Sequence, residues 1–258
     1  MHLNSSRKSR LLAVGVGVLL SAVMSTAGAA STGSPTKAIQ AAIADAGRPQ
    51  ADVQRDANRK PADVLKFAGI KPGDTVAEFL PGQFYYTRIL SKLVGPKGHV
   101  YVLVRLATRP NPLKDDPRYA NVSVVEWKET FALPQPVDVV WTSDNYHDMA
   151  NNPALNPPGT VQQAFASLKP GGIFLVLDHR AAPGTGIHDT GRLHRIDPEV
   201  VKGDALQAGF VLDADSDVLT RPADDHTLSA RDPSMHDVTD QFIFKFRKPP
   251  SSKNAGNN

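Results

Sequence analysis

Hydrophobic residues come in short runs along most of the chain, and helical or irregular segments separate these runs. Such runs, without strict alternation of apolar and polar positions, are typical of parallel strands in a sheet covered on both faces. Strands that take turns with helices predict crossover units and a doubly wound α/β sheet. The predicted strands are 75–80, 99–104, 122–127, 137–142 and 172–178, and the clearest predicted helices between them are 87–95 and 160–172.

The pattern changes near the C-terminus, where residues 210–219 and 240–249 form two further strand-like segments. In the second segment Phe242, Phe244 and Phe246 alternate with Ile243 and Lys245. This alternation predicts an antiparallel pair that closes the sheet. The expected fold class is therefore α/β, with a three-layer, Rossmann-like sheet of seven strands.

The first residues have the organisation of a secretory signal. Arg7, Lys8 and Arg10 precede an apolar run over residues 11–24, and small residues follow at 27–29. This order predicts a signal peptide over 1–29 and a periplasmic or secreted protein. A membrane-anchoring helix is the alternative, but a helix that spans the bilayer needs about 20 apolar residues, and the run over 11–24 is shorter. The rest divides into an N-terminal helical arm (30–60), a main domain (61–249) and a disordered tail (250–258).

Charge and cysteine content narrow the possible partners. The chain has 29 Lys and Arg and 26 Asp and Glu, and three of the basic residues lie in the predicted signal. The remainder is formally neutral, so we expect no nucleic-acid binding and no stable membrane insertion after cleavage. The chain has no cysteine, which excludes disulfides and thiol chemistry. The sequence does not indicate an oligomeric state.

Several longer motifs carry a family resemblance. They are "GPKGHVY" at 95–101, "NYHDM" at 145–149, "LKPGG" at 168–172, the segment 177–198 and "RPADDHT" at 221–227. With the strand order, they resemble class I S-adenosylmethionine-dependent methyltransferases, and more narrowly an exported bacterial family of predicted methyltransferases. The resemblance implies an exported enzyme that methylates a small molecule with S-adenosylmethionine as cofactor.

The resemblance also implies a cofactor site at the turn after the first strand. Glu78 and Gly82 match the acid and the glycine of that motif, whereas Gln83 and Phe84 stand where the family has glycine. Arg105 follows the second strand, where the family has an acid that accepts hydrogen bonds from ribose. The residues assigned to the cofactor side are Glu78, Gly82, Gln83, Phe84, Tyr85, Trp127, Glu129 and Asp144.

Ionisable residues gather after the fourth and fifth predicted strands, at the sheet edge where ligands of such folds bind. We assign His147 as the base that removes the acceptor's proton, with Asp148 orienting it. The resemblance places acceptor-side groups in these loops. The residues assigned to the substrate side are Tyr146, Asp178, His179, Arg180 and His194.

Two alternatives stay open. A non-catalytic exported protein could keep the fold and bind a ligand through the altered cofactor loop, as Gln83, Phe84 and Arg105 suggest. A metal-dependent hydrolase or oxidase that uses the histidines and aspartates of this edge is the other. Separately, Asp144, Asp178 and His179 resemble the metal ligands of methyltransferases that act on catechols. Salt bridges that anchor the loop after the fifth strand are the favoured explanation of these residues, so we assign none to a metal.

Overall fold

The computed structural model describes residue 1 and residues 35–105 and 111–250. The predicted signal peptide and the predicted tail beyond residue 250 lie outside the described residues. Within the described ranges, no helix has both the length and the apolar character needed to cross a membrane. The helical arm and the main domain belong to the same compact unit.

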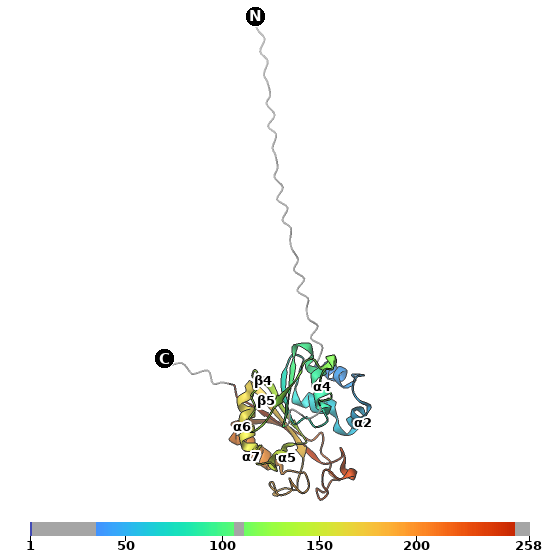
Figure 1. The fold of residues 1–258 in the computed structure, drawn as a ribbon, viewed down its shortest axis with the longest axis vertical. Helices are drawn as coiled ribbons and strands as arrows, with labels where there is room; N and C mark the ends of the chain where they lie inside the picture. The colour runs from blue at the N-terminus through green and yellow to red at the C-terminus, as the bar shows by residue number, and fades with distance from the viewer. Residues whose placement is uncertain (2–34, 106–110, 251–258) are drawn as a thin grey trace, which may run out of the picture. The chain divides into compact units, whose positions relative to one another are not determined.

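One mixed sheet of seven strands organises the molecule (Figure 1), as the sequence predicts. Its order is β3-β2-β1-β4-β5-β7-β6, and β7 runs antiparallel to both of its neighbours. All other pairs are parallel. The strands are β1 (Thr75–Phe79), β2 (His99–Val104), β3 (Val122–Glu126), β4 (Val137–Ser143), β5 (Leu168–His179), β6 (Val211–Ser216) and β7 (Gln241–Arg247).

Helices cover both faces of this sheet. The helices α1 to α4 lie on one face, and α5, α6 and α7 lie on the other. Their bounds are α1 (Pro35–Ile43), α2 (Gln50–Arg59), α3 (Pro61–Ala68), α4 (Tyr85–Val94), α5 (Tyr146–Ala150), α6 (Pro157–Ser167) and α7 (Pro198–Gln207), with short 3₁₀ turns at Gly95–Lys97, Pro117–Tyr119 and Pro233–Met235.

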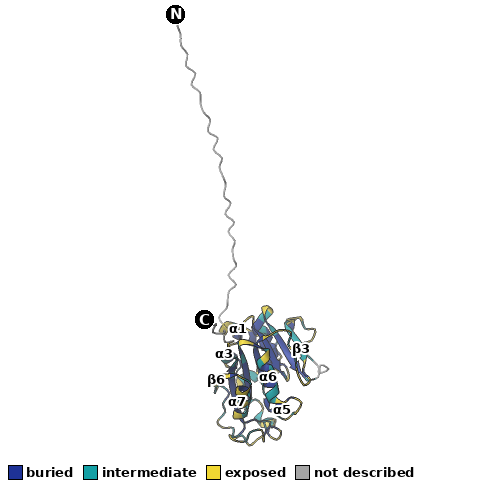
Figure 2. Ribbon diagram, turned by 90° about the vertical axis from the view of Figure 1, so that its left-hand side faces the viewer, coloured by how far each residue is buried: buried dark blue, intermediate teal, exposed yellow. Residues whose placement is uncertain are grey.

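The central strand β1 shows why the sheet needs both layers. All five of its residues are buried. Val76 packs against the layer of α3 and α4, whereas Ala77 and Phe79 pack against the layer of α5 to α7. In Figure 2 the inner strands of the sheet are mostly coloured as buried, while α6 and α7 show exposed residues on their outer sides. Burial of both faces explains the continuous apolar runs of the sequence.

Several helices differ from the sequence-based expectation. The predicted helical arm contains two helices, α1 and α2, and α2 was not recognised as a separate helix because its polar segment has only a thin apolar stripe. Residues 145–149, predicted to be a loop, overlap the short helix α5 (Tyr146–Ala150). Pro198 at the first position of α7 and Asp197 as its N-cap mark a helix that we did not predict.

Candidate functional site

The carboxyl ends of β1, β4 and β5 meet at one edge of the sheet, where open α/β sheets bind their ligands. A cavity of about 230 Å³ opens there, between the turn after β1 and the end of β4. Its volume falls below the ~300–1,000 Å³ of typical ligand pockets. The lining residues are Arg55, Arg59, the segment 78–83, Tyr85, Tyr86, Ser143 and Asp144.

The turn between β1 and α4 has an alternating left-handed backbone. Leu80, Gly82 and Phe84 have φ angles of 47°, 56° and 63°. Glycine adopts this conformation without strain, whereas a residue with a side chain does so at a cost of roughly 1–2 kcal/mol. The residues in glycine-type positions are therefore Leu80 and Phe84. Gln83 does not adopt this conformation, contrary to the sequence-based expectation, and its carbonyl accepts a hydrogen bond from Arg88.

Phe84 does not line the 230 Å³ cavity between the turn after β1 and the end of β4, which we call the cavity above β1. Its side chain is buried in the core on the α4 side, and it borders a different, larger cavity of about 840 Å³ that is lined mainly by residues between Asn111 and Glu126. That larger cavity shares no residue with the histidines and aspartates of the strand ends. Leu80, which the sequence analysis did not single out, is the left-handed non-glycine residue of the turn that lines the cavity above β1.

Glu78 occupies the position of the acid in the cofactor motif, and it is buried beneath the cavity. The hydroxyl of Thr87 donates a hydrogen bond of 2.5 Å to its Oε2. Burial raises the pKa of Glu78 to about 7, although Thr87 and Arg88 favour the charged form. Near neutral pH this carboxyl is therefore poised between its two protonation states.

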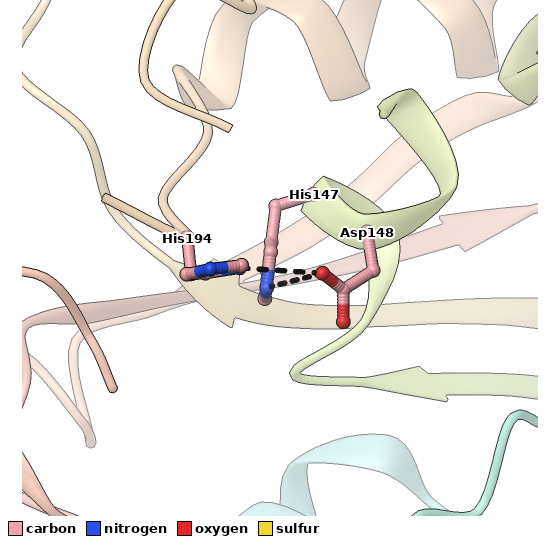
Figure 3. A group of neighbouring side chains, drawn as sticks. All are labelled: His147, Asp148 and His194. Carbon is pink, nitrogen blue, oxygen red and sulfur yellow. Dashed lines mark hydrogen bonds and ion pairs between the residues drawn. The ribbon is translucent and has the colours of Figure 1, made fainter. Parts of the chain in front are cut away.

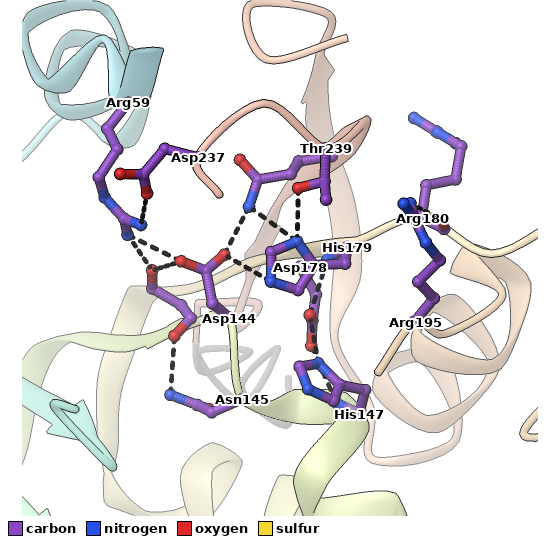
Figure 4. Close-up of polar contacts among 12 residues, drawn as sticks. Arg59, Asp144, Asn145, His147, Asp178, His179, Arg180, Arg195, Asp237 and Thr239 are labelled. Carbon is purple, nitrogen blue, oxygen red and sulfur yellow. Dashed lines mark hydrogen bonds and ion pairs between the residues drawn. The ribbon is translucent and has the colours of Figure 1, made fainter. Parts of the chain in front are cut away.

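The guanidinium of Arg59 reaches across the cavity from α2 (Figure 4). Its Nη2 donates to Asp144 Oδ2 at 2.8 Å, and its Nη1 lies 3.2 Å from Asp237 Oδ1. The rings of Tyr85 and Tyr86 lie 4.8 and 5.1 Å from the same guanidinium. Arg59 therefore occupies much of the space in which a ligand would meet Asp144.

Helix α2 is held in this position by polar contacts at several points. Asp52 accepts a hydrogen bond of 2.8 Å from Arg88, and Asp56 accepts one of 2.6 Å from Tyr85. Arg55 makes a bidentate pair with Asp237, with both distances 2.7 Å. The sequence analysis missed these residues, although two arginines spaced four apart on a polar helix were a usable signal.

His147 forms a buried pair with Asp178, across the ends of β4 and β5 (Figure 4). The His147 Nδ1 lies 2.7 Å from Asp178 Oδ1, and the His147 backbone N–H donates to Oδ2 at 2.9 Å. Burial alone would lower the pKa of His147, but the Asp178 carboxylate outweighs it and the pKa is raised. Burial would likewise raise the pKa of Asp178, but His147 lowers it. Asp178 therefore fixes the ring through Nδ1 and leaves Nε2 for contacts on the other side of the ring.

The second nitrogen of His147 faces Asp148 and His194 (Figure 3). His147 Nε2 lies 3.4 Å from Asp148 Oδ1, and His194 Nδ1 lies 3.3 Å from the same oxygen. The exposed side chain of Arg231 donates to Asp148 Oδ1 at 3.2 Å. Burial and the nearby Arg231 lower the pKa of His194. The predicted residues His147, Asp148 and His194 are thus brought together.

His179 connects this group to the cavity above β1. Its Nδ1 lies 2.7 Å from the Thr239 hydroxyl, and its Nε2 lies 4.0 Å from Asp144 Oδ1. Gln241 donates to that Asp144 oxygen at 2.6 Å. The metal set considered from the sequence does not assemble, because Asp178 directs its oxygens to His147 and to the His179 backbone N–H.

Other predicted site residues lie elsewhere. Trp127 is fully buried against Phe79, with ring centroids 5.1 Å apart, and Glu129 is exposed. The Tyr146 hydroxyl donates to Asp204 of α7 at 2.6 Å. Neither Arg180 nor Arg105 lines the cavity above β1: Arg180 pairs with Asp240 at 3.0 Å, and Arg105 donates to the Trp127 carbonyl at 3.1 Å.

Comparison with known proteins yields structural neighbours. No protein-family model and no curated protein sequence matches the chain. The 4+2 cyclase SpnF is 16% identical, with a TM-score of 0.55 over 75% of this chain and 82% of its own. The N-methyltransferase NodS from Bradyrhizobium japonicum WM9 is 12% identical, with a TM-score of 0.53 over 76% and 96%.

A putative sarcosine dimethylglycine methyltransferase from Galdieria sulphuraria is similar to the same extent. It is 15% identical, with a TM-score of 0.52 over 75% of this chain and 85% of its own. At such identities the similarity concerns the fold, and the same fold hosts different activities. The seven-stranded order, with its antiparallel β7, therefore gives this chain the fold of the class I S-adenosylmethionine-dependent methyltransferases.

Proposed function

We propose that the protein is an exported S-adenosylmethionine-dependent methyltransferase that acts on a small molecule. The observation that carries the proposal is the buried pair of His147 and Asp178, at the sheet edge where this fold binds its ligands. A histidine whose Nδ1–H is fixed by a carboxylate presents a basic Nε2 to an acceptor. The ring of His147 lies 5.6 Å from that of His179, whose Nε2 is 4.0 Å from Asp144 at the cavity above β1.

The charges of that cavity suit the amino-acid end of the cofactor. Arg55 and Arg59 offer guanidinium groups for its carboxylate, and Asp144 offers a carboxylate for its ammonium. The adenosyl end fits less well, because Leu80 and Phe84 occupy glycine-type positions of the turn and Arg105 follows β2 in place of an acid. The cofactor would supply the methyl group when bound.

The chain's own residues supply the proton transfer. His147 Nε2 would accept the proton of the acceptor's hydroxyl, amine or thiol, while Asp178 stabilises the resulting imidazolium through Nδ1–H. Only 3% of His147 is exposed, so an acceptor has to insert a narrow group to reach it. This supports a small-molecule acceptor. The periplasmic or secreted location rests on the N-terminal sequence pattern.

Isothermal titration with S-adenosylmethionine and S-adenosylhomocysteine tests the proposal. We expect micromolar binding to the purified protein, and an Arg59→Ala variant that binds about 10- to 100-fold more weakly, because it loses a charge-assisted hydrogen bond to the ligand carboxylate. Arg59→Lys keeps the charge and is expected to fall between the two. Wild-type affinity in Arg59→Ala would contradict this role of Arg59, and no binding to the native protein would contradict the proposed function.

The second candidate function is a non-catalytic exported protein that binds another ligand in the same place. The left-handed Leu80 and the small volume of the cavity favour it. In that case native protein does not bind S-adenosylmethionine, and a Leu80→Gly variant is expected to gain measurable binding because glycine enlarges the cavity and relaxes the turn. Asn156→Gly is the matched control, since it relaxes another left-handed residue that does not line the cavity. Equal behaviour of both variants would show that Leu80 is not the obstacle.

A further inference from the structure

We propose that His147, Asp148 and His194 bind a divalent transition-metal ion such as Zn²⁺. Among the described residues, these three each place one potential ligand atom within 4.8 Å of the others (Figure 3). They come from α5 and from the segment between β5 and α7, so the tertiary fold assembles the group. The site differs from the set of Asp144, Asp178 and His179 considered from the sequence.

The spacing of the ligand atoms matches tetrahedral coordination. Zinc binds nitrogen and carboxylate oxygen at about 2.0–2.2 Å, which puts neighbouring ligands of a tetrahedron roughly 3.3–3.5 Å apart. Two of the separations already have this value: 3.4 Å from His147 Nε2 to Asp148 Oδ1, and 3.3 Å from His194 Nδ1 to the same oxygen. The ligand nitrogens of His147 and His194 lie within 4.8 Å of each other, so side-chain movement of up to about 1.4 Å brings them to the same spacing.

Asp178 prepares His147 to act as a ligand. Histidines that bind metals usually donate their second ring N–H to a carboxylate or carbonyl, which fixes the tautomer and the ring orientation. The Nδ1 of His147 makes this contact with Asp178 at 2.7 Å, and Asp178 is fully buried. The lone pair of Nε2 is therefore directed toward Asp148 and His194.

The backbone at His194 is held in a conformation that a non-glycine residue rarely adopts. His194 has a φ of 53°, and strained residues of this kind persist where the surrounding structure fixes them. The next residue, Arg195, is fully buried in a pair with Asp224 at 2.8 Å, and the Leu193 carbonyl accepts a hydrogen bond from Ala230. These contacts hold the imidazole of His194 over Asp148.

When no metal ion is bound, the guanidinium of Arg231 is a counter-ion of the Asp148 carboxylate. Its Nη2 is 3.2 Å from Asp148 Oδ1, and the Arg231 side chain is 63% exposed. Exposed ion pairs contribute only about 0–1 kcal/mol, so a divalent ion bound by two imidazoles can displace the guanidinium. The Asp148 side chain is itself 40% exposed, which leaves a route for the ion from solvent.

The ligand types select the class of ion. Two imidazoles with one carboxylate suit zinc, iron, nickel or copper, whereas magnesium and calcium prefer oxygen ligands. Three protein ligands leave a coordination position for water or for a heteroatom of the substrate. Metal binding at His147 Nε2 and the proton transfer to the same nitrogen proposed above are mutually exclusive, so a metal-loaded site would rule out His147 as the base. Zinc binding can be measured without S-adenosylmethionine.

Zinc titration of metal-free protein tests this site. We expect one Zn²⁺ per chain by isothermal titration, and Co²⁺ in its place should give the visible absorption of a four- or five-coordinate site. His194→Asn and Asp148→Asn are expected to weaken Zn²⁺ binding by more than about 10-fold, since even the loss of an outer partner commonly costs 10- to 100-fold. Asparagine tolerates the left-handed backbone of residue 194.

His226→Asn is the matched control. His226 also has a left-handed φ, 64°, and its Nε2 lies 3.0 Å from the Asp240 carboxylate. Its side chain is 18% exposed, against 17% for His194. We expect this variant to bind Zn²⁺ as the native protein does. Absence of stoichiometric Zn²⁺ binding, or equal affinities in His194→Asn and the native protein, would overturn the proposal. Neither result would bear on S-adenosylmethionine binding, which is measured separately.

Discussion

Replacing Asp224 by alanine is expected to lower the free energy of unfolding by about 3–5 kcal/mol, because it leaves the Arg195 guanidinium buried without its counter-ion. The Arg195 and Asp224 side chains are 0% and 3% exposed, and two hydrogen bonds of 2.8 and 3.1 Å join them. Asp224 also accepts the backbone N–H groups of Asp240 and His226. Urea unfolding followed by circular dichroism measures the loss.

The double variant Asp224→Ala/Arg195→Met separates the cost of an unpaired charge from the cost of losing contacts. Removing both charges is expected to recover a large part of the lost stability, because a buried ion pair often contributes little beyond apolar residues of similar volume. Glu199→Ala, which breaks the exposed pair with Lys202, is the surface control and should cost less than about 1 kcal/mol. If Asp224→Ala costs no more than this control, Arg195 does not depend on Asp224.

Glu78→Gln is expected to stabilise the protein at alkaline pH. The pKa of Glu78 in the folded state is raised to about 7, so the unfolded state loses its proton first as the pH rises. The stability that the protonated Glu78 gives the folded state is therefore fully present below about pH 4.3. It falls as the pH rises to about 7, and above that the charged Glu78 destabilises the folded state by a constant amount. Glutamine stays neutral and still accepts the Thr87 hydrogen bond. The expected gain at pH 9 is about 3 kcal/mol.

Urea unfolding of Glu78→Gln and the native protein between pH 4.5 and 9 measures this difference. It should be small at the acid end and grow as the pH passes through 7. Glu199→Gln on the exposed side of α7 controls for general effects of removing a carboxylate, and it should change the stability little at any pH. A stability difference for Glu78→Gln that stays constant with pH would show that Glu78 titrates normally.

The strands of the sheet could be predicted from the sequence because a strand that is buried on both faces needs apolar residues along most of its length. The run 137–142 is apolar almost throughout, since β4 lies between two strands and under two helix layers. The alternating phenylalanines of β7 correctly placed an antiparallel pair at the end of the sheet. Helix α2 was not predicted, because it is held by ion pairs and hydrogen bonds more than by an apolar stripe.

The site was harder to predict, since its contacts join residues that are distant in the chain. The sequence placed His147 and Asp178 on the same edge, but their pairing depends on how the ends of β4 and β5 meet. We assigned the orienting role to Asp148 because it is adjacent in sequence, whereas the structure places Asp178 on Nδ1 and Asp148 near Nε2. No sequence pattern indicated that Arg59 would reach Asp144.

The contact between Arg59 and Asp144 also determines which ligands can enter the cavity. A zwitterionic ligand exchanges partners there: its carboxylate replaces Asp144 at the arginine, and its ammonium replaces the arginine at Asp144. The number of ion pairs does not fall in this exchange, so we expect its affinity to change little with ionic strength. A neutral ligand has to separate the pair and receives no compensation. The ion pair of Arg59 and Asp144 thus competes with the ligand's own charged groups. Because only a zwitterionic ligand compensates for breaking this pair, we expect the cavity to select amino-acid-like groups.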